Sequence, residues 1–175
     1  MITKNFKVFV STVFGRTTSS TETVSLPVPI KDVTGSEYSS LYFVTTNYNL
    51  FSVDGNHSTN LTGTQAANSI QLFVGTNGSE VTENDYTIDD ITTLSAVGST
   101  SFVRAMSEDG YAMTITRTLK NTSDADITIK ELGMVKSTAY KKDTSAKFLF
   151  AREVLPTPLV VPAGNSFTVS MVVKV

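Results

Sequence analysis

The sequence predicts an all-β protein, an antiparallel β-sandwich or jelly roll with an N-terminal arm. Apolar and polar residues alternate from Phe167 to Val175, the period-two pattern of a strand with one face on a core. Residues from Tyr111 to Leu119 alternate in the same way. Thr, Ser and Val are the commonest residues, and their short runs are separated by turn residues. At 175 residues we expect an arm and linker, 1–23, and a single β-sandwich domain, 24–175.

The arm fits two periodicities. Its aromatic and aliphatic residues have helical spacing, yet Phe6, Val8 and Val10 also have strand spacing with β-branched side chains, so we favour a strand. Exposed apolar side chains are costly, so the arm must pack on its own domain or on a neighbouring subunit. We predict four residues that contact a partner, namely Phe6, Phe9, Val10 and Phe14.

The middle of the chain reads as short strands between polar connections. Arg16 to Thr23 reads as a flexible link, and the prolines of Leu26 to Ile30 make that stretch extended. The polar loop Asp54 to Gly63 is of the kind found at an exposed tip, and Thr76 to Asp90 is an acidic connection. The predicted strands are Leu41 to Thr46, Leu50 to Val53, Ser69 to Gly75 and Val97 to Met106.

The last third predicts further strands. The turn Asn121 to Asp124 should lead into Ile127 to Ile129 as the returning strand of a hairpin. Gly133 within a strand pattern indicates a bulge or a close backbone approach. The remaining expectations are a loop over Lys136 to Lys147, a strand over Phe148 to Leu155 stopped by Pro156 and Pro158, and a turn over Pro162 to Asn165.

Charge is distributed unevenly along the chain. Residues 32–103 contain no Lys or Arg and carry a net charge of -8, while the rest of the chain carries +6, which together give -2. Complementary faces of this kind could dock head-to-tail in an assembly. Alternatively, folding interleaves the two halves and mixes the charges on the surface.

Catalytic and metal-binding groups are sparse. The single histidine, His57, lies in the polar loop without a nucleophile-elbow motif, and we predict no enzyme. Asp54, Asn56 and Ser58 alternate as calcium ligands do, but Thr59 stands where an EF-hand requires Gly. A second acidic group comprises Glu83, Asp85, Asp89 and Asp90. Acidic loops are usually hydrated and the chain has no Cys, so we predict no metal and no cofactor.

Other binding classes receive weaker support. Basic residues gather late, at Lys136, Lys141, Lys142, Lys147 and Arg152, but a pI near 5.4 argues against nucleic acid and favours the acidic face of a protein partner. Glycan binding near Tyr48 and His57 is an alternative. The opening residues do not read as a signal peptide and no stretch has the length of a spanning helix, so we expect no membrane association.

Several segments, taken in their order along the chain, resemble those of small structural proteins of tailed-bacteriophage virions. These segments are Met1 to Phe6, Phe73-Val-Gly-Thr76 with Asp85-Tyr86, Leu119 to Gly133, Phe148 to Leu155, and Val161 to Val169. The similarity covers most of the chain and is closest over the last sixty residues. The arm departs from it, because similar proteins have a more helical arm with Leu and Ala.

The resemblance implies a non-enzymatic virion component, assembled in the host cytoplasm and present in many copies or as a homo-oligomer. A capsid auxiliary or decoration protein that binds major capsid, neck or tail subunits is the leading hypothesis. The alternative is a neck, collar or tail-fibre component, for which the loop Asp54 to Gly63 would be the receptor- or glycan-binding tip.

Overall fold

The computed structural model describes residues 1–14, 22–43, 70–89, 91, 93–98, 100–107, 110–141 and 144–174. These residues form one α-helix and nine β-strands, which confirms the all-β prediction. In chain order the elements are α1 (Lys4–Phe14), β1 (Glu22–Lys31), β2 (Glu37–Phe43), β3 (Ile70–Gly75), β4 (Leu94–Ala96), β5 (Ser101–Ser107), β6 (Gly110–Asn121), β7 (Ile127–Lys141), β8 (Thr144–Val161) and β9 (Ser166–Lys174).

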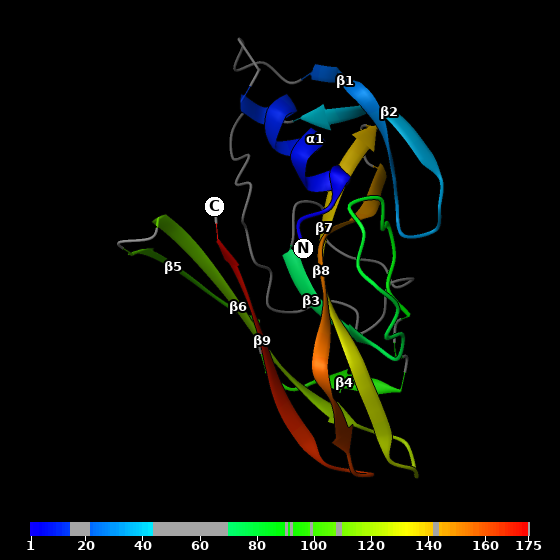
Figure 1. Cartoon of the computed structure of the whole chain (residues 1–175). Coiled ribbons are helices and arrows are strands. Elements are labelled where there is room, and N and C mark those ends of the chain that lie inside the picture. The colour runs from blue at the N-terminus through cyan, green and yellow to red at the C-terminus, as the bar shows by residue number, and fades with distance from the viewer. Residues whose placement is uncertain are drawn as a thin grey trace.

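The strands form three antiparallel sheets. β1 pairs with β2, and β7 lies between β3 and β8. β6 is the centre of the third sheet, with β4 and β5 along one edge and β9 along the other. Figure 1 shows the long strands of the two larger sheets running side by side and diverging towards one end.

The two larger sheets enclose a common core. Met113 and Ile115 of β6 and Met171 of β9 are buried in one cluster with Leu72 of β3 and Phe148 of β8. Along β9 the buried and exposed positions alternate as predicted, because every second side chain faces the opposite sheet. The packing is therefore that of a β-sandwich, although the strand connections do not establish a jelly roll.

The arm is a helix, so the strand prediction for it was wrong. The Phe6 and Phe9 rings both lie against Phe150, with ring centroids 5.4 and 5.0 Å apart. A strand would direct residues three positions apart to opposite faces, whereas a helix places them on one. Burial of this pair outweighs the small helix-propensity cost of β-branched neighbours. The carbonyl of Thr3 accepts the N–H of Lys7 and begins the helix.

Burial of the arm changes its predicted role in partner binding. Phe6 is 5% exposed and Phe9 is fully buried, so both contact the core of their own chain. A partner could reach these two rings only if the helix detached. Val10 is half-buried against the same core, and the side chain of Phe14 lies outside the described structure.

Two predictions about β7 and β8 were wrong. The segment Lys136 to Lys147 is not a loop, because β7 continues to Lys141 and β8 begins at Thr144. The prolines also do not stop β8. Its pairing with β7 jumps from Val154 to Leu159, so Pro156 and Pro158 occupy an interval of the ladder where no donor is required.

β6 and β7 do not form the expected hairpin. Both edges of β6 are occupied by strands of its own sheet, and β7 enters the other sheet. The side chain of Asn121 turns the chain, because its Nδ2 donates to the carbonyls of Ala125 at 2.8 Å and Val161 at 3.1 Å. The turn at Pro162 to Asn165 was predicted correctly, and Gly164 adopts a φ of 73° within it.

Replacing Phe9 with Ala should destabilise the protein by about 3–5 kcal/mol, because it leaves a cavity against Phe150. Denaturant unfolding measures this loss. Lys7→Ala on the exposed side of the same helix is the control and should change stability much less. An unchanged midpoint for Phe9→Ala would contradict the packing of α1 on this core.

Candidate functional site

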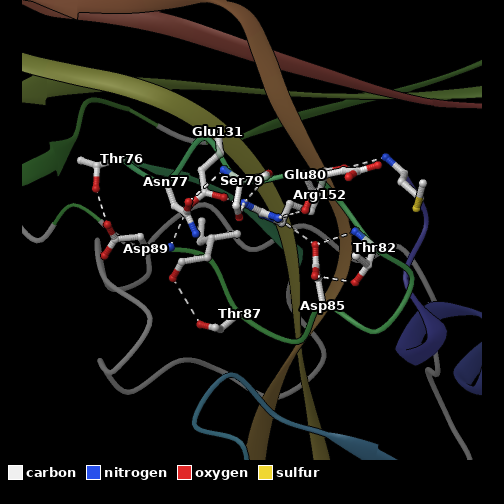
Figure 2. A network of polar contacts seen from close by, with 12 residues as sticks. Thr76, Asn77, Ser79, Glu80, Thr82, Asp85, Thr87, Asp89, Glu131 and Arg152 are labelled. Atoms are coloured by element: carbon white, nitrogen blue, oxygen red, sulfur yellow. Dashed lines mark hydrogen bonds and ion pairs between the residues drawn. The ribbon is translucent and has the colours of Figure 1, made fainter.

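A buried guanidinium organises the most polar part of the interior. Arg152 of β8 is 3% exposed, and its Nε donates to Oε2 of Glu131 at 2.6 Å. Glu131 lies on the neighbouring strand β7 and is fully buried. Asp85 accepts from the Nη1 of Arg152 at 2.8 Å (Figure 2). One buried cation therefore faces two carboxylates from segments far apart in the chain.

The remaining donors of Arg152 are also occupied. Its Nη1 reaches the carbonyl of Glu80 at 3.4 Å, and its Nη2 reaches the carbonyl of Ser79 at 3.4 Å and the Ser79 hydroxyl at 3.2 Å. A guanidinium has five N–H groups, and each has an acceptor here. Arg152 therefore has no donor left for a substrate or an anionic ligand, and the network is structural.

The network holds the acidic connection 76–89 against the sheet (Figure 2). Its far end is fixed because Oε1 of Glu131 accepts the N–H of Asp89 at 2.8 Å. The chain terminus joins the same place, since the Met1 amino group donates to the Arg152 carbonyl at 2.5 Å. The backbone N–H of Lys4 also donates to the carbonyl of Glu83 at 2.7 Å.

Two glycines permit this close packing. A Cβ on Gly75 would lie within 3 Å of the Glu131 side chain and the Asp89 carbonyl. A Cβ on Gly133 would meet the Ile88 side chain at 2.8 Å, so a side chain approaches this glycine closely, whereas the sequence predicted a bulge or a close backbone approach. Any larger residue at either position would push the connection away from the sheet.

Asp85 is held in its ionised form. Partial burial alone would raise its pKa, but hydrogen bonds from Arg152 and Thr82 and the Arg152 charge outweigh burial and lower the pKa. Glu83 faces Lys7 instead, at 2.7 Å, and the Asp89 carboxylate accepts from Thr76. These three carboxylates therefore have separate partners. The described residues contain no group of three acidic or His side chains placed to hold a metal, and Asp90 lies outside them.

The late basic residues do not form a surface patch. Lys136 is fully buried, Lys147 is 9% exposed and Arg152 is 3% exposed. The side chains of Lys141 and Lys142 lie outside the described structure. These three buried residues therefore cannot make the predicted contact with an acidic partner.

Burial strongly perturbs the ionisation of Lys136. Desolvation by burial lowers its pKa from 10.5 to about 7. Lys136 pairs with Phe148 across the β7–β8 ladder. A lysine with such a pKa can serve as a general base, but a substrate has no access to a fully buried amine.

The exposed side of the β5–β6–β9 sheet is a second candidate site, which we call the outer face. Its central row joins Val103, Thr114 and Val172, and the two valines are 57% and 53% exposed. Thr116 and Ser170 share a hydrogen bond of 2.8 Å in the next row. The remaining positions include Ser101, Ala105, Ala112, Thr118, Lys120, Thr168 and Lys174.

The outer face is composed mainly of small side chains, and its two charged residues, Lys174 and Lys120, lie towards opposite ends of β6. β5 and β9 each pair with β6 and have no other partner among the described strands. Open strand edges usually carry charges, prolines or bulges that prevent pairing. β9 has no proline and carries its one charge at the last position, so its edge is open to another strand.

The predicted loop site cannot be placed. Tyr48, His57 and the rest of the loop Asp54 to Gly63 lie outside the described residues, as does the predicted strand Leu50 to Val53. The sequence prediction did not include the outer face, since it rested on the apolar stripe of β9. The signal for the outer face was the complementary stripe of Thr, Ser and Val at alternate positions of β6 and β9.

Comparison with known proteins adds no relative, since no family model, curated protein or solved structure matches this chain. No helix in the described part of the chain is long and apolar enough to cross a bilayer. The site must therefore be interpreted from its own geometry.

Replacing Glu131 with Gln should destabilise the fold by roughly 3–5 kcal/mol, because Arg152 would keep its buried charge without its closest counter-ion. Chemical unfolding measures the loss, and proteolysis should begin within residues 76–89. Glu83→Gln removes an exposed ion pair with Lys7 and serves as the control, with no measurable change expected. Equal effects of the two changes would contradict the buried network.

Lys136→Met should change the pH dependence of the unfolding free energy. The folded-state pKa of Lys136 is about 7, below the 10.5 of the unfolded chain, so the unfolded state binds more protons between these values. The unfolding free energy of the wild type should therefore rise by roughly 2 kcal/mol from pH 7 to 9 relative to Lys136→Met. Lys130→Met changes an exposed position of β7 and is the control. Its unfolding free energy should change with pH as that of the wild type does.

Proposed function

We propose that this protein is a non-enzymatic structural protein of a bacteriophage virion, of the capsid auxiliary or decoration type. Its outer face binds a neighbouring virion subunit. The resemblance of its ordered segments to small virion proteins supports the virion assignment. The exposed valines among the small hydroxyl residues of the outer face support a role in assembly.

The observation that carries the proposal is the central row of the outer face. Val103 and Val172 remain more than half exposed although they flank a strand at the centre of a sheet. Burial of apolar area contributes about 25 cal/mol per Å² before the costs of association. A stable interface covers about 800 Å² on each partner, so neighbouring rows and an edge strand would take part. The hydroxyl groups around the valines can be satisfied by hydrogen bonds at such an interface.

The interior network suits this role. It fixes the connection 76–89 and α1 to the β7–β8 sheet, and the buried sides of β6 and β9 pack on that sheet through the common core. A preformed surface loses little conformational freedom on binding. Many copies could then bind equivalent sites on a shell.

A neck, collar or tail-fibre location is the alternative within the same class. Such parts form closed rings or trimers, whereas a decoration subunit is expected to bind a completed shell. Light scattering of the purified chain over a range of concentrations distinguishes the two. A stable closed oligomer would favour the neck, collar or fibre, and a monomer would favour decoration.

Val172→Lys should greatly reduce the amount of this protein in purified virions, because it places a charge at the centre of the outer face. The control is Val160→Lys on β8, since Val160 is 55% exposed against 53% for Val172. Each variant is supplied to a phage that lacks the gene, and particle composition is measured by quantitative mass spectrometry. Equal incorporation of both variants would exclude the outer face, and absence of the wild type from particles would exclude the virion role.

A further inference from the structure

A tyrosine-lined hollow of about 590 Å³ lies between the β1–β2 hairpin and the end of β7. Its aromatic residues are Tyr38 and Tyr42 of β2 and Tyr140 of β7, and all three are half-buried. Tyr38 and Tyr42 are four positions apart on one strand, so both side chains lie on the same face of it. Figure 1 shows the hairpin beside the upper end of β7, where the hollow is formed.

The aromatic part of the hollow is fixed before any ligand binds. The rings of Tyr38 and Tyr140 are 4.6 Å apart and tilted by 58°. Tyr38 also meets the buried Phe148 ring edge-on at 5.4 Å, and its hydroxyl donates to Asp32 at 3.0 Å. Asp32 is itself held, because it accepts the N–H groups of Thr34 at 2.9 Å and Ser36 at 3.0 Å.

Hydroxyl groups surround the rings. Thr23, Ser39 and Ser40 line the hollow with the phenol groups, and all of these can donate and accept hydrogen bonds. A ligand that offers C–H groups to an aromatic face and hydroxyl groups to the rim would satisfy both parts. Pyranose sugars have this combination, and the volume is in the usual range for a small-molecule site.

The charge around the hollow favours a neutral ligand. Glu37 is the single charged residue among its lining residues, and it has Lys31 as a counter-ion, with Nζ and Oε1 3.8 Å apart. The described lining residues include no cation for a phosphate or sulfate group. A quaternary ammonium ion would also be attracted to tyrosine faces, but Lys31 reduces the attraction of Glu37 for it.

We propose that this hollow is a binding site for a neutral saccharide, with Tyr42 and Tyr140 as stacking surfaces and Ser40 as a hydrogen-bonding group. The hollow can bind a sugar whether or not the protein belongs to a virion.

Saturation-transfer NMR with the intact chain tests the site. The probes are glucose, galactose, mannose, N-acetylglucosamine and their common disaccharides, each at about 10 mM, where a site of millimolar Kd is mostly filled. We expect transfer to the ring protons of at least one of these sugars. Absence of transfer from all of them would overturn the proposal, as would stronger transfer to choline measured in the same way.

Substitutions locate the site. Tyr42→Ala should weaken binding of the responding sugar at least tenfold, whereas Tyr86→Ala removes an exposed tyrosine outside the hollow and should leave binding unchanged. Ser40→Arg places a bulky side chain on the same face of β2 as the two tyrosines, so it blocks the hollow and tests the site if Tyr42→Ala fails to fold. Wild-type binding by a folded Ser40→Arg or Tyr42→Ala would exclude this hollow.

Discussion

The buried charge of Arg152 is the constraint on which much of this structure depends. An arginine cannot lose its proton in a protein, so its burial requires carboxylates and carbonyls at fixed places. Glu131 supplies the nearest carboxylate from β7, and Asp85 brings in the acidic connection. Because Met1 pairs with the backbone of the same residue, the position of α1 is tied to it as well. Electrostatics here determines where three distant segments meet.

Carboxylates of the acidic block 32–103 pair with basic residues outside it. Asp85 pairs with the buried Arg152, and Glu83 pairs with Lys7 at the surface. Folding therefore interleaves the acidic block with the basic remainder at these places, which favours the second of the two interpretations of the charge pattern.

The fold separates a rigid interior from surfaces with different chemistry. The outer face presents exposed valines among small hydroxyl residues, whereas the hollow presents half-buried tyrosines. Both surfaces rest on strands whose other faces are packed in the core, so neither requires a conformational change to bind. A structural protein with a sugar site of this kind could attach to its assembly by one surface and to a carbohydrate by the other.

The sequence alone determined the strand periodicity, because alternation records which face of a strand is buried. It therefore predicted β3, β6 and β9 and the turn at Gly164. Tertiary structure decided what alternation cannot show. The arm is a helix because Phe6 and Phe9 both contact Phe150. Both edges of β6 are paired with strands of its own sheet, and β7 belongs to the other sheet. The pairing of Arg152 with Glu131 and Asp85, and the meeting of Tyr38 with Tyr140, are long-range contacts whose partners have no spacing rule in the sequence.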